Sequence, residues 1–233
     1  DMKWFVTAAN RLDHVDIYRW DGANLTLSKR IATGKTPSHL WIDSKSTTVY
    51  ATMQDSDELV AIDLQTQAIK WRVRTGAMPA DVFGTADDRR LLVALTGSDA
   101  VEVYELGAKE PVLTKLVKTG QGAHAFRALG DQRHVLVSNR VGNSISKLDL
   151  QTMTVVSTFP VPGGPDCMEV TKDGKLLWRH DKKKDYRTAV IPTPIYSDGH
   201  VFATSGYGAG CDLLKLTSTG GKTTAESVYE NKN

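Results

Sequence analysis

Two histidines and two aspartates are the residues of this sequence best placed to do chemistry. His39, Asp81, His124 and Asp166 each follow a turn marked by Gly or Pro, in the phrases TGKTPSHL, TGAMPADV, TGQGAHAF and VPGGPDCM. Imidazole and carboxylate groups can hold divalent ions such as zinc. We expect these four side chains to line a ligand site. The phrases supply different chemistry at each position, so we predict no metal site, catalytic residue or cofactor.

The phrase recurs at a spacing of about 42 to 44 residues, which is typical of a β-propeller. Each copy is followed by a second apolar run, then by a third such as ELVAIDL and a fourth such as QAIKWRVRT. Alternating runs separated by polar turns predict strands joined by hairpins. A sheet of four such strands cannot bury its own faces, so the copies must stack around an axis. The predicted fold is all-β, a propeller of four-stranded antiparallel blades in one domain over residues 1–233.

The first run of each copy is the innermost strand, and its start faces the axial channel where propellers usually bind ligands. At the amino terminus, FVTAAN, HVDIYRW and LTLSKRI match only the second, third and fourth runs, so the chain opens in mid-blade. We predict six blades, with an irregular one near residues 165–191. Five are expected if that segment completes the opening blade. An unpaired blade edge would invite self-association.

The repeat resembles the YVTN-type β-propeller repeat over residues 1–177. The resemblance is carried by the turn Gly34–Pro37, its copy Gly76–Pro79, the phrase DGKLL and the DL endings of the third runs. After Trp178 the spacing breaks, and residues 178–233 resemble the repeat of pyrroloquinoline-quinone-dehydrogenase-like propellers. This change suggests a natural or engineered chimera of two propeller fragments; one divergent repeat in a natural protein is the alternative.

In quinoproteins the quinone lies between a stacking tryptophan and a disulfide of adjacent cysteines. The resemblance would imply a bound quinone only if that site were present. This sequence has two cysteines, Cys167 and Cys211, and they are not adjacent. Their strand-like contexts predict buried thiols. We therefore expect no quinone, and we expect the tryptophans Trp4, Trp20, Trp41, Trp71 and Trp178 to pack between blades. The glycine-rich stretch 205–210 precedes a strand, which favours a connecting loop over a phosphate site.

Composition argues against several partners. The 29 basic and 27 acidic residues are interspersed and leave a net charge of +2, so no broad field attracts nucleic acid. No apolar stretch approaches the roughly 20 residues that span a bilayer, and residues 1–10 lack a signal peptide's pattern. We expect a soluble protein; the resembled families imply a periplasmic or extracellular location.

The function expected from these observations is a non-enzymatic scaffold or binding domain, a fusion of propeller fragments without specific activity. The alternative is an enzyme, a metal-assisted hydrolase or a lactonase-like protein that uses the axial channel. A peptide-binding surface on exposed loops or a free blade edge is a third class, for which no partner is indicated.

Overall fold

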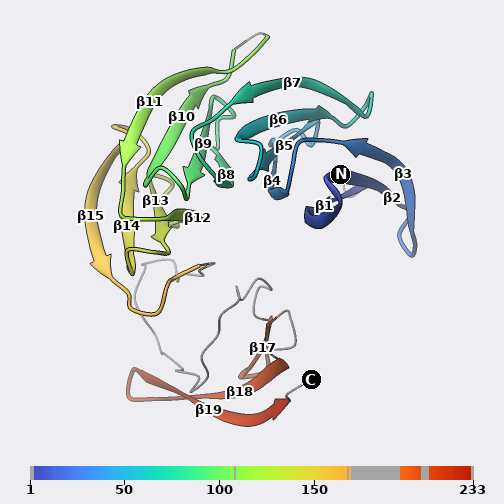
Figure 1. Cartoon of the computed structure of the whole chain (residues 1–233). Coiled ribbons are helices and arrows are strands. Elements are labelled where there is room, and N and C mark those ends of the chain that lie inside the picture. Colours follow the sequence, from blue (N-terminus) through green and yellow to red (C-terminus); the bar gives the residue numbers. More distant parts are fainter. Residues whose placement is uncertain (1–2, 108, 167, 169–194, 206–209, 232–233) are drawn as a thin grey trace. The chain divides into compact units, whose positions relative to one another are not determined.

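The computed structural model describes residues 3–107, 109–166, 168, 195–205 and 210–231 (Figure 1). The chain divides into two compact units, which are treated separately below. The first comprises Asp1–Ala128 with Gln132–Pro165, and the second Leu129–Asp131 with Asp166–Asn233.

The first unit is built from antiparallel strands that follow one another along the chain. They are β1 (Trp4–Ala9), β2 (His14–Trp20), β3 (Leu25–Ala32), β4 (Pro37–Ile42), β5 (Thr48–Met53), β6 (Glu58–Asp63), β7 (Ala68–Arg74), β8 (Pro79–Gly84), β9 (Arg90–Leu95), β10 (Ala100–Glu105), β11 (Val112–Lys118), β12 (Ala123–Ala128), β13 (His134–Asn139), β14 (Ser144–Asp149) and β15 (Thr154–Pro160). A short 3-10 turn, η1 (Asn10–Leu12), joins β1 to β2.

These strands form one three-stranded and three four-stranded sheets, each in chain order: β1-β2-β3, β4-β5-β6-β7, β8-β9-β10-β11 and β12-β13-β14-β15. Figure 1 shows the sheets following one another with β4, β8 and β12 on their inner side. The four-stranded antiparallel blades and the incomplete opening blade predicted from the repeat are confirmed.

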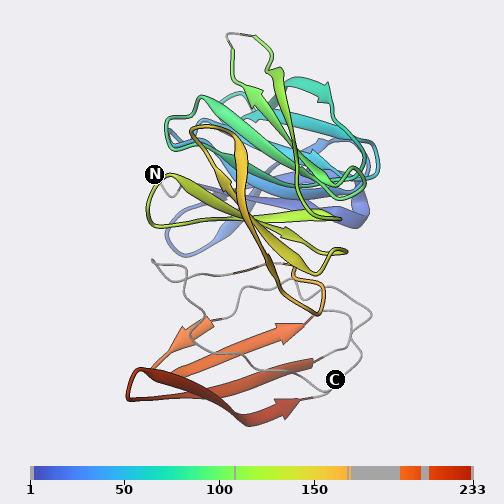
Figure 2. The same cartoon turned by 90° about the vertical axis from the view of Figure 1, so that its left-hand side faces the viewer.

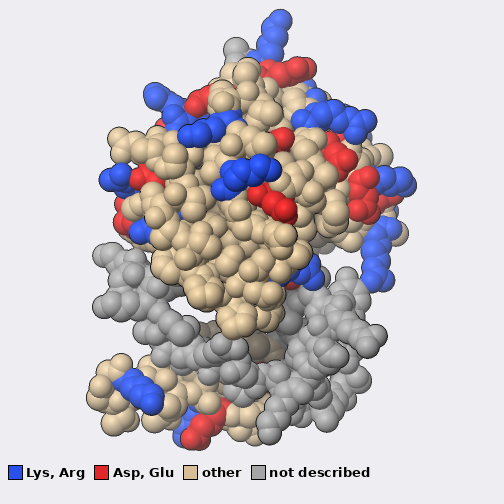
Figure 3. Space-filling model, turned by 60° about the vertical axis from the view of Figure 1, so that its left-hand side comes forward, with Lys and Arg blue, Asp and Glu red and all other residues tan. Residues whose placement is uncertain are grey.

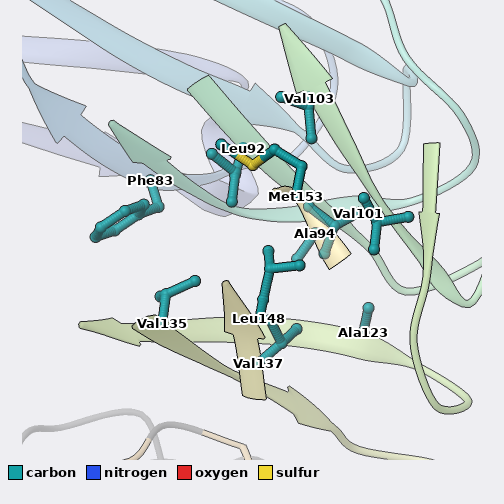
Figure 4. Close-up of a cluster of buried hydrophobic side chains, with 11 residues drawn as sticks. Phe83, Leu92, Ala94, Val101, Val103, Ala123, Val135, Val137, Leu148 and Met153 are labelled. Carbon is teal, nitrogen blue, oxygen red and sulfur yellow. The ribbon is translucent and has the colours of Figure 1, made fainter. Parts of the chain in front are cut away.

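Neighbouring sheets pack face to face through apolar side chains. Figure 4 shows the third and fourth sheets, where Leu92, Ala94, Val101 and Val103 face Ala123, Val135, Val137 and Leu148. Similar clusters join the first sheet to the second and the second to the third. Trp4, Trp41 and Trp71 lie at the margins of these clusters, so their predicted packing role is confirmed. Burial of apolar area between sheets is the main favourable term that holds them together.

A polar contact also recurs between successive blades. An Asp or Asn with positive φ ends the turns between β1 and β2, β5 and β6, β9 and β10, and β13 and β14: Asp13, Asp57, Asp99 and Asn143. Each side-chain oxygen accepts a hydrogen bond from a backbone N–H of the loop that leads to the next blade, at 2.8 to 3.1 Å. Asn and Asp tolerate the left-handed backbone and provide the acceptor, which explains their use here.

The DLQT phrase has a local explanation as well. Asp63 Oδ1 accepts hydrogen bonds from the backbone N–H groups of Gln65 and Thr66, and Asp149 Oδ1 does the same for Gln151 and Thr152. These Asx turns close the hairpin between the third and fourth strands.

The second unit contains one antiparallel sheet, β16 (Ile195–Ser197), β17 (His200–Ser205), β18 (Gly210–Thr219) and β19 (Lys222–Asn231), paired in that order (Figure 2). These strands add a further four-stranded antiparallel sheet of the predicted kind. Cys211 is partly exposed and its Sγ lies 3.2 Å from the Tyr229 hydroxyl, so the expectation of a buried thiol is wrong there. Cys167, Trp178 and most of the expected irregular blade lie outside the described residues.

The described part of the chain thus holds five sheets, and the predicted count of six blades is not confirmed. Figure 3 shows basic and acidic side chains interspersed on the face in view, as the composition predicts. Among the described residues, no helix has the length and apolar character needed to cross a bilayer.

Candidate functional site

The three candidate residues of the first unit all lie in β-bulges of the inner strands. The pairing of β4 with β5 shifts between Pro37 and Leu40, and that of β8 with β9 shifts between Pro79 and Val82. The pairing of β12 with β13 shifts in the same way between Ala123 and Phe126. His39, Asp81 and His124 are therefore bulge residues, and a bulge re-aims the side chains that it carries.

The side chains of His39 and Asp81 are in hydrogen-bonding contact across two neighbouring blades. His39 Nδ1 lies 3.0 Å from Asp81 Oδ1, with the two side chains 25% and 17% exposed. The carboxylate is held by two backbone donors, since Val82 N–H donates to Oδ1 and Phe126 N–H donates to Oδ2, each at 2.8 Å. A carboxylate can only accept, so Nδ1 of His39 carries the proton in this contact. The bond fixes both the ring orientation and the tautomer of His39.

His124 lies beside this pair. Its ring centroid is 5.7 Å from that of His39, with the rings inclined at 60°. His124 Nδ1 approaches Thr96 Oγ1 at 3.4 Å, while that hydroxyl donates to the Ala123 carbonyl at 2.9 Å. Because the hydroxyl proton is directed to the carbonyl, the imidazole Nδ1–H is the donor to Thr96. Three adjacent inner strands thus bring two imidazoles and a carboxylate together.

Hydroxyl groups that support the bulges are functional residues that the sequence reasoning missed. Thr52 Oγ1 accepts a hydrogen bond from His39 N–H at 3.2 Å and donates to the Ala80 carbonyl. Ser138 Oγ accepts from Ala125 N–H at 3.0 Å in the fourth sheet. Both hydroxyls come 13 residues after the bulge residue that they cap, and that shared spacing is a signal from which they could have been found.

Three of the four predicted residues, His39, Asp81 and His124, lie close together. That they line a ligand site stays a prediction. Asp166, the fourth predicted residue, belongs to the second compact unit, so its membership stays a prediction. Among the described residues, no group of three His, Cys, Asp or Glu side chains is arranged to hold a metal ion.

The chain is similar in sequence to a known protein family and to two curated proteins. The sequence model of the YNCE-like beta-propeller family matches residues 1–192. The chain is 28% identical to the uncharacterized protein YncE of Salmonella typhimurium (strain LT2) over 179 residues, which cover 75% of this chain and 50% of that protein. YncE of Salmonella typhi is 27% identical with the same coverage. The chain spans about half the length of these curated relatives.

Two solved structures share the fold. The periplasmic gluconolactonase PpgL of Pseudomonas aeruginosa matches with a TM-score of 0.75 and 12% identity, covering 94% of this chain and 77% of that one. A protein of Bacteroides fragilis described as a candidate 6-phosphogluconolactonase matches with a TM-score of 0.68 and 14% identity, covering 100% of this chain and 81% of that one. At this identity the likeness is one of fold.

These comparisons correct two expectations. The predicted non-enzymatic scaffold, a fusion without specific activity, is contradicted because the structural neighbours include gluconolactonases and the curated relatives are natural bacterial proteins. The chimera of YVTN-type and quinoprotein-like fragments is not supported either, because one family model runs through residue 178 without interruption. Strand and turn patterns are shared by unrelated propeller repeats, so a change in repeat spacing does not identify a junction between two fused fragments. The chain belongs to the YNCE-like β-propeller family.

Proposed function

We propose that the protein is a lactonase-like hydrolase in which His39 acts as the general base. The observation that carries this proposal is the contact of His39 Nδ1 with Asp81 Oδ1 at 3.0 Å, made by bulge residues of adjacent inner strands. A carboxylate that holds one ring nitrogen protonated leaves the other, Nε2, to accept a proton from water. The gluconolactonases among the structural neighbours support the same reaction class.

The partners of Asp81 suit it to its role. The backbone N–H groups of Val82 and Phe126 orient both carboxylate oxygens, and they belong to two different strands. The carboxylate charge stabilises the imidazolium that forms when His39 takes a proton. Because backbone N–H groups orient the Asp81 carboxylate, this orientation does not require a flexible cationic side chain beside Asp81.

We assign the second proton-transfer step to His124. Its Nδ1 approaches the hydroxyl oxygen of Thr96 at 3.4 Å, and that oxygen can accept a hydrogen bond from either the neutral or the protonated ring. A ring whose centroid is 5.7 Å from that of His39 can reach the same small carbonyl group. In its imidazolium form, with protons on both ring nitrogens, His124 can keep its contact with Thr96 and donate the other proton to the leaving oxygen.

The proposed reaction opens a lactone ring with water. His39 removes a proton from water as its oxygen forms a bond to the lactone carbonyl carbon. The tetrahedral adduct then collapses, the ring carbon–oxygen bond breaks, and the departing alkoxide receives a proton from the imidazolium of His124. The product is a hydroxy acid. Transfer of the proton from His39 to His124 through solvent returns His39 to its neutral form and His124 to its imidazolium form.

This assignment departs from a metal-assisted mechanism. We assign activation of water to His39 because Asp81 fixes its ring orientation and tautomer. Treatment of the purified protein with EDTA should leave lactone hydrolysis unchanged, and added zinc or calcium should not raise it.

A pH-indicator assay tests the proposal, because each lactone opened releases an acid. We would compare the hydrolysis of glucono-1,5-lactone and dihydrocoumarin with the buffer rate. His39→Ala and Asp81→Asn should each lower kcat/KM by roughly 100-fold or more, while Lys29→Ala on the exposed strand β3 should not change it. The proposal is wrong if the unaltered protein hydrolyses neither lactone above background, or if His39→Ala keeps the full rate.

Two finer expectations also stay proposals. A periplasmic or extracellular location is supported by the name of the P. aeruginosa structural neighbour, a periplasmic gluconolactonase. The six-blade count is supported by the repeat spacing alone.

A further inference from the structure

Three large apolar side chains are exposed on loops that border the candidate site. Leu12, Met78 and Val141 are 68%, 41% and 62% exposed. Met78 precedes Asp81 by three residues, in the loop that leads into β8. Binding sites for small molecules combine apolar walls with a few polar groups, so the contacts of these three residues bear on what the site can hold.

The loop that carries Met78 is bonded to a residue that contacts His124. Thr96 N–H donates to the Met78 carbonyl at 3.0 Å, and Thr96 Oγ1 lies 3.4 Å from His124 Nδ1. Met78 N–H donates to Asp57 Oδ1 at 2.9 Å, so both backbone polar groups of Met78 are held in place. The position of Met78 is therefore fixed close to Asp81 in the chain and to His124 through Thr96.

Val141 lies against the loop that leads to His124. Its N–H donates to the Gln121 carbonyl at 3.2 Å, and Arg140 N–H donates to the Gly122 carbonyl at 2.8 Å. A Cβ added at Gly122 would lie 2.7 Å from Val141 Cγ2, so the valine side chain packs on that glycine. Gly122 precedes His124 by two residues. The Val141 side chain is therefore next to the start of the strand that carries His124.

Leu12 borders the strand that carries His39. It ends the short turn η1, and the Asn10 side chain at the start of that turn donates to the Pro37 carbonyl at 3.2 Å. Pro37 begins β4 and precedes His39 by two residues. Each of the three inner strands β4, β8 and β12 thus has one exposed apolar residue near its start, where its site residue also lies.

Polar groups around the site are already engaged within the protein. The Asp81 carboxylate accepts two backbone N–H groups and contacts His39. The Thr52 and Thr96 hydroxyls each donate to a backbone carbonyl. Carboxylates of the neighbouring loops accept backbone N–H groups in the same way: Asp13, Asp57 and Asp99. A substrate rich in hydroxyl groups would leave some of them unpaired on binding, which costs free energy, whereas an alkyl chain needs no partner.

We propose that the substrates are lactones that carry an apolar chain, and that Leu12, Met78 and Val141 contact this chain. The assignment rests on the proposed hydrolase function, because it names the substrate class of the same site. While the lactone carbonyl faces His39, the chain lies on the exposed apolar residues of the neighbouring loops. Each methylene that leaves water there adds to the binding free energy. A compact polyhydroxylated lactone gains nothing from these contacts.

Two lactones with the same ring test the substrate class: δ-valerolactone, which has no side chain, and δ-decalactone, which carries a pentyl group. Each kcat/KM is divided by the rate constant for hydroxide-catalysed opening of that lactone, because the pentyl group itself alters the reactivity of the ring. The normalised value for δ-decalactone should exceed that for δ-valerolactone by roughly tenfold or more. Equal normalised values would overturn the substrate class and leave the hydrolase proposal standing, because both rings would still open.

Variants of the exposed apolar residues test the contact with the chain. Met78→Gln and Val141→Thr keep the size of each side chain and replace an apolar group by a polar one. Each should lower the ratio between the two normalised values by roughly threefold or more. Leu116→Gln is the matched control, because Leu116 is similarly exposed but lies on the outer strand β11. A ratio that neither site variant lowers, or that Leu116→Gln lowers equally, would overturn the assignment.

An NMR experiment tests the same contact without catalysis. The probes are the lactams piperidin-2-one and 6-pentylpiperidin-2-one, which resemble the two lactones and resist hydrolysis. In protein labelled with ¹³C at the methionine methyl groups, the Met78 signal is assigned by its loss in Met78→Gln. The pentyl lactam should shift this signal saturably at concentrations at which piperidin-2-one does not. No shift, or equal shifts with both lactams, would overturn the contact. A shift in a protein that opens no lactone would refute the hydrolase and the substrate class together.

Discussion

Replacement of Asp99 tests whether the recurring contact between blades stabilises the fold. Asp99 has a φ of 53°, and its Oδ1 accepts a hydrogen bond of 2.8 Å from the buried N–H of Gly122. Asp99→Ala removes the acceptor, which costs about 1 kcal/mol. It also places an alanine in the left-handed region, at a further cost of about 1 kcal/mol. We expect Asp99→Ala to lower the free energy of unfolding by about 2 kcal/mol.

The chain supplies its own control for this experiment. Asn143 occupies the corresponding position of the next blade, with a φ of 49° and hydrogen bonds from Gly163 and Gly164. Asp99→Asn should therefore change stability by less than about 0.5 kcal/mol. Urea unfolding followed by far-UV circular dichroism measures both variants. If Asp99→Asn costs as much as Asp99→Ala, the contact depends on charge and the argument from acceptor and backbone is refuted.

Three further predictions concern packing, acid stability and support of the site. Gly84→Ala should destabilise the fold by about 1 to 3 kcal/mol in urea unfolding, because the added Cβ would overlap the indole of Trp41; an unchanged midpoint would contradict this. The Arg133 side chain lies 2.7 Å from Asp149 and lowers the pKa of that carboxyl from 3.8 to about 2. The ionised Asp149 therefore stabilises the fold fully above about pH 4, and this stabilisation is lost as the pH falls toward 2. Asp149→Asn should remove this part of the acid dependence, as measured by unfolding between pH 2 and 5. Thr52→Val should cost about 1 to 3 kcal/mol, because it leaves the His39 N–H and the Ala80 carbonyl unpaired; equal stability would show that neither bond matters.

The strands of the repeat were predictable because their signals are local. The third-run phrases at 58–64 and 100–106 correspond to β6 (Glu58–Asp63) and β10 (Ala100–Glu105), each within one residue. Alternation of apolar residues and the flanking turn residues act over a few positions, so they can be read without the partner sheets. The spacing of the copies then indicated the propeller architecture, which the family match bears out.

The candidate site was predicted as a set of residues but not as a geometry. By sequence position His39 aligns with Asp81 and Ala125, while His124 aligns with Ser38. In a regular strand these two positions face opposite sides. The bulges place two residues opposite one, and they bring His124 near His39 all the same. The bulge cannot be recognised from the sequence of a single repeat, because the extra residue is defined only by the pairing with the second strand.

The expected lack of enzymatic activity was inferred from the absence of a contiguous motif, and in a propeller that absence carries little information. Propeller sites draw one residue from each of several blades, so their members lie about 42 residues apart and form no contiguous pattern. His39 and Asp81 meet only because β4 and β8 belong to adjacent sheets.

The sequence alone determined the strand order, the four-stranded blades and the incomplete opening blade, since hydrophobic alternation and turn chemistry are properties of neighbouring residues. Only the tertiary structure decided which side chains meet. The contact of His39 with Asp81 depends on strand register and on the packing of one sheet against the next, and so does the capping of bulges by Thr52 and Ser138. Those relations join residues far apart in the chain, and no local pattern carries them.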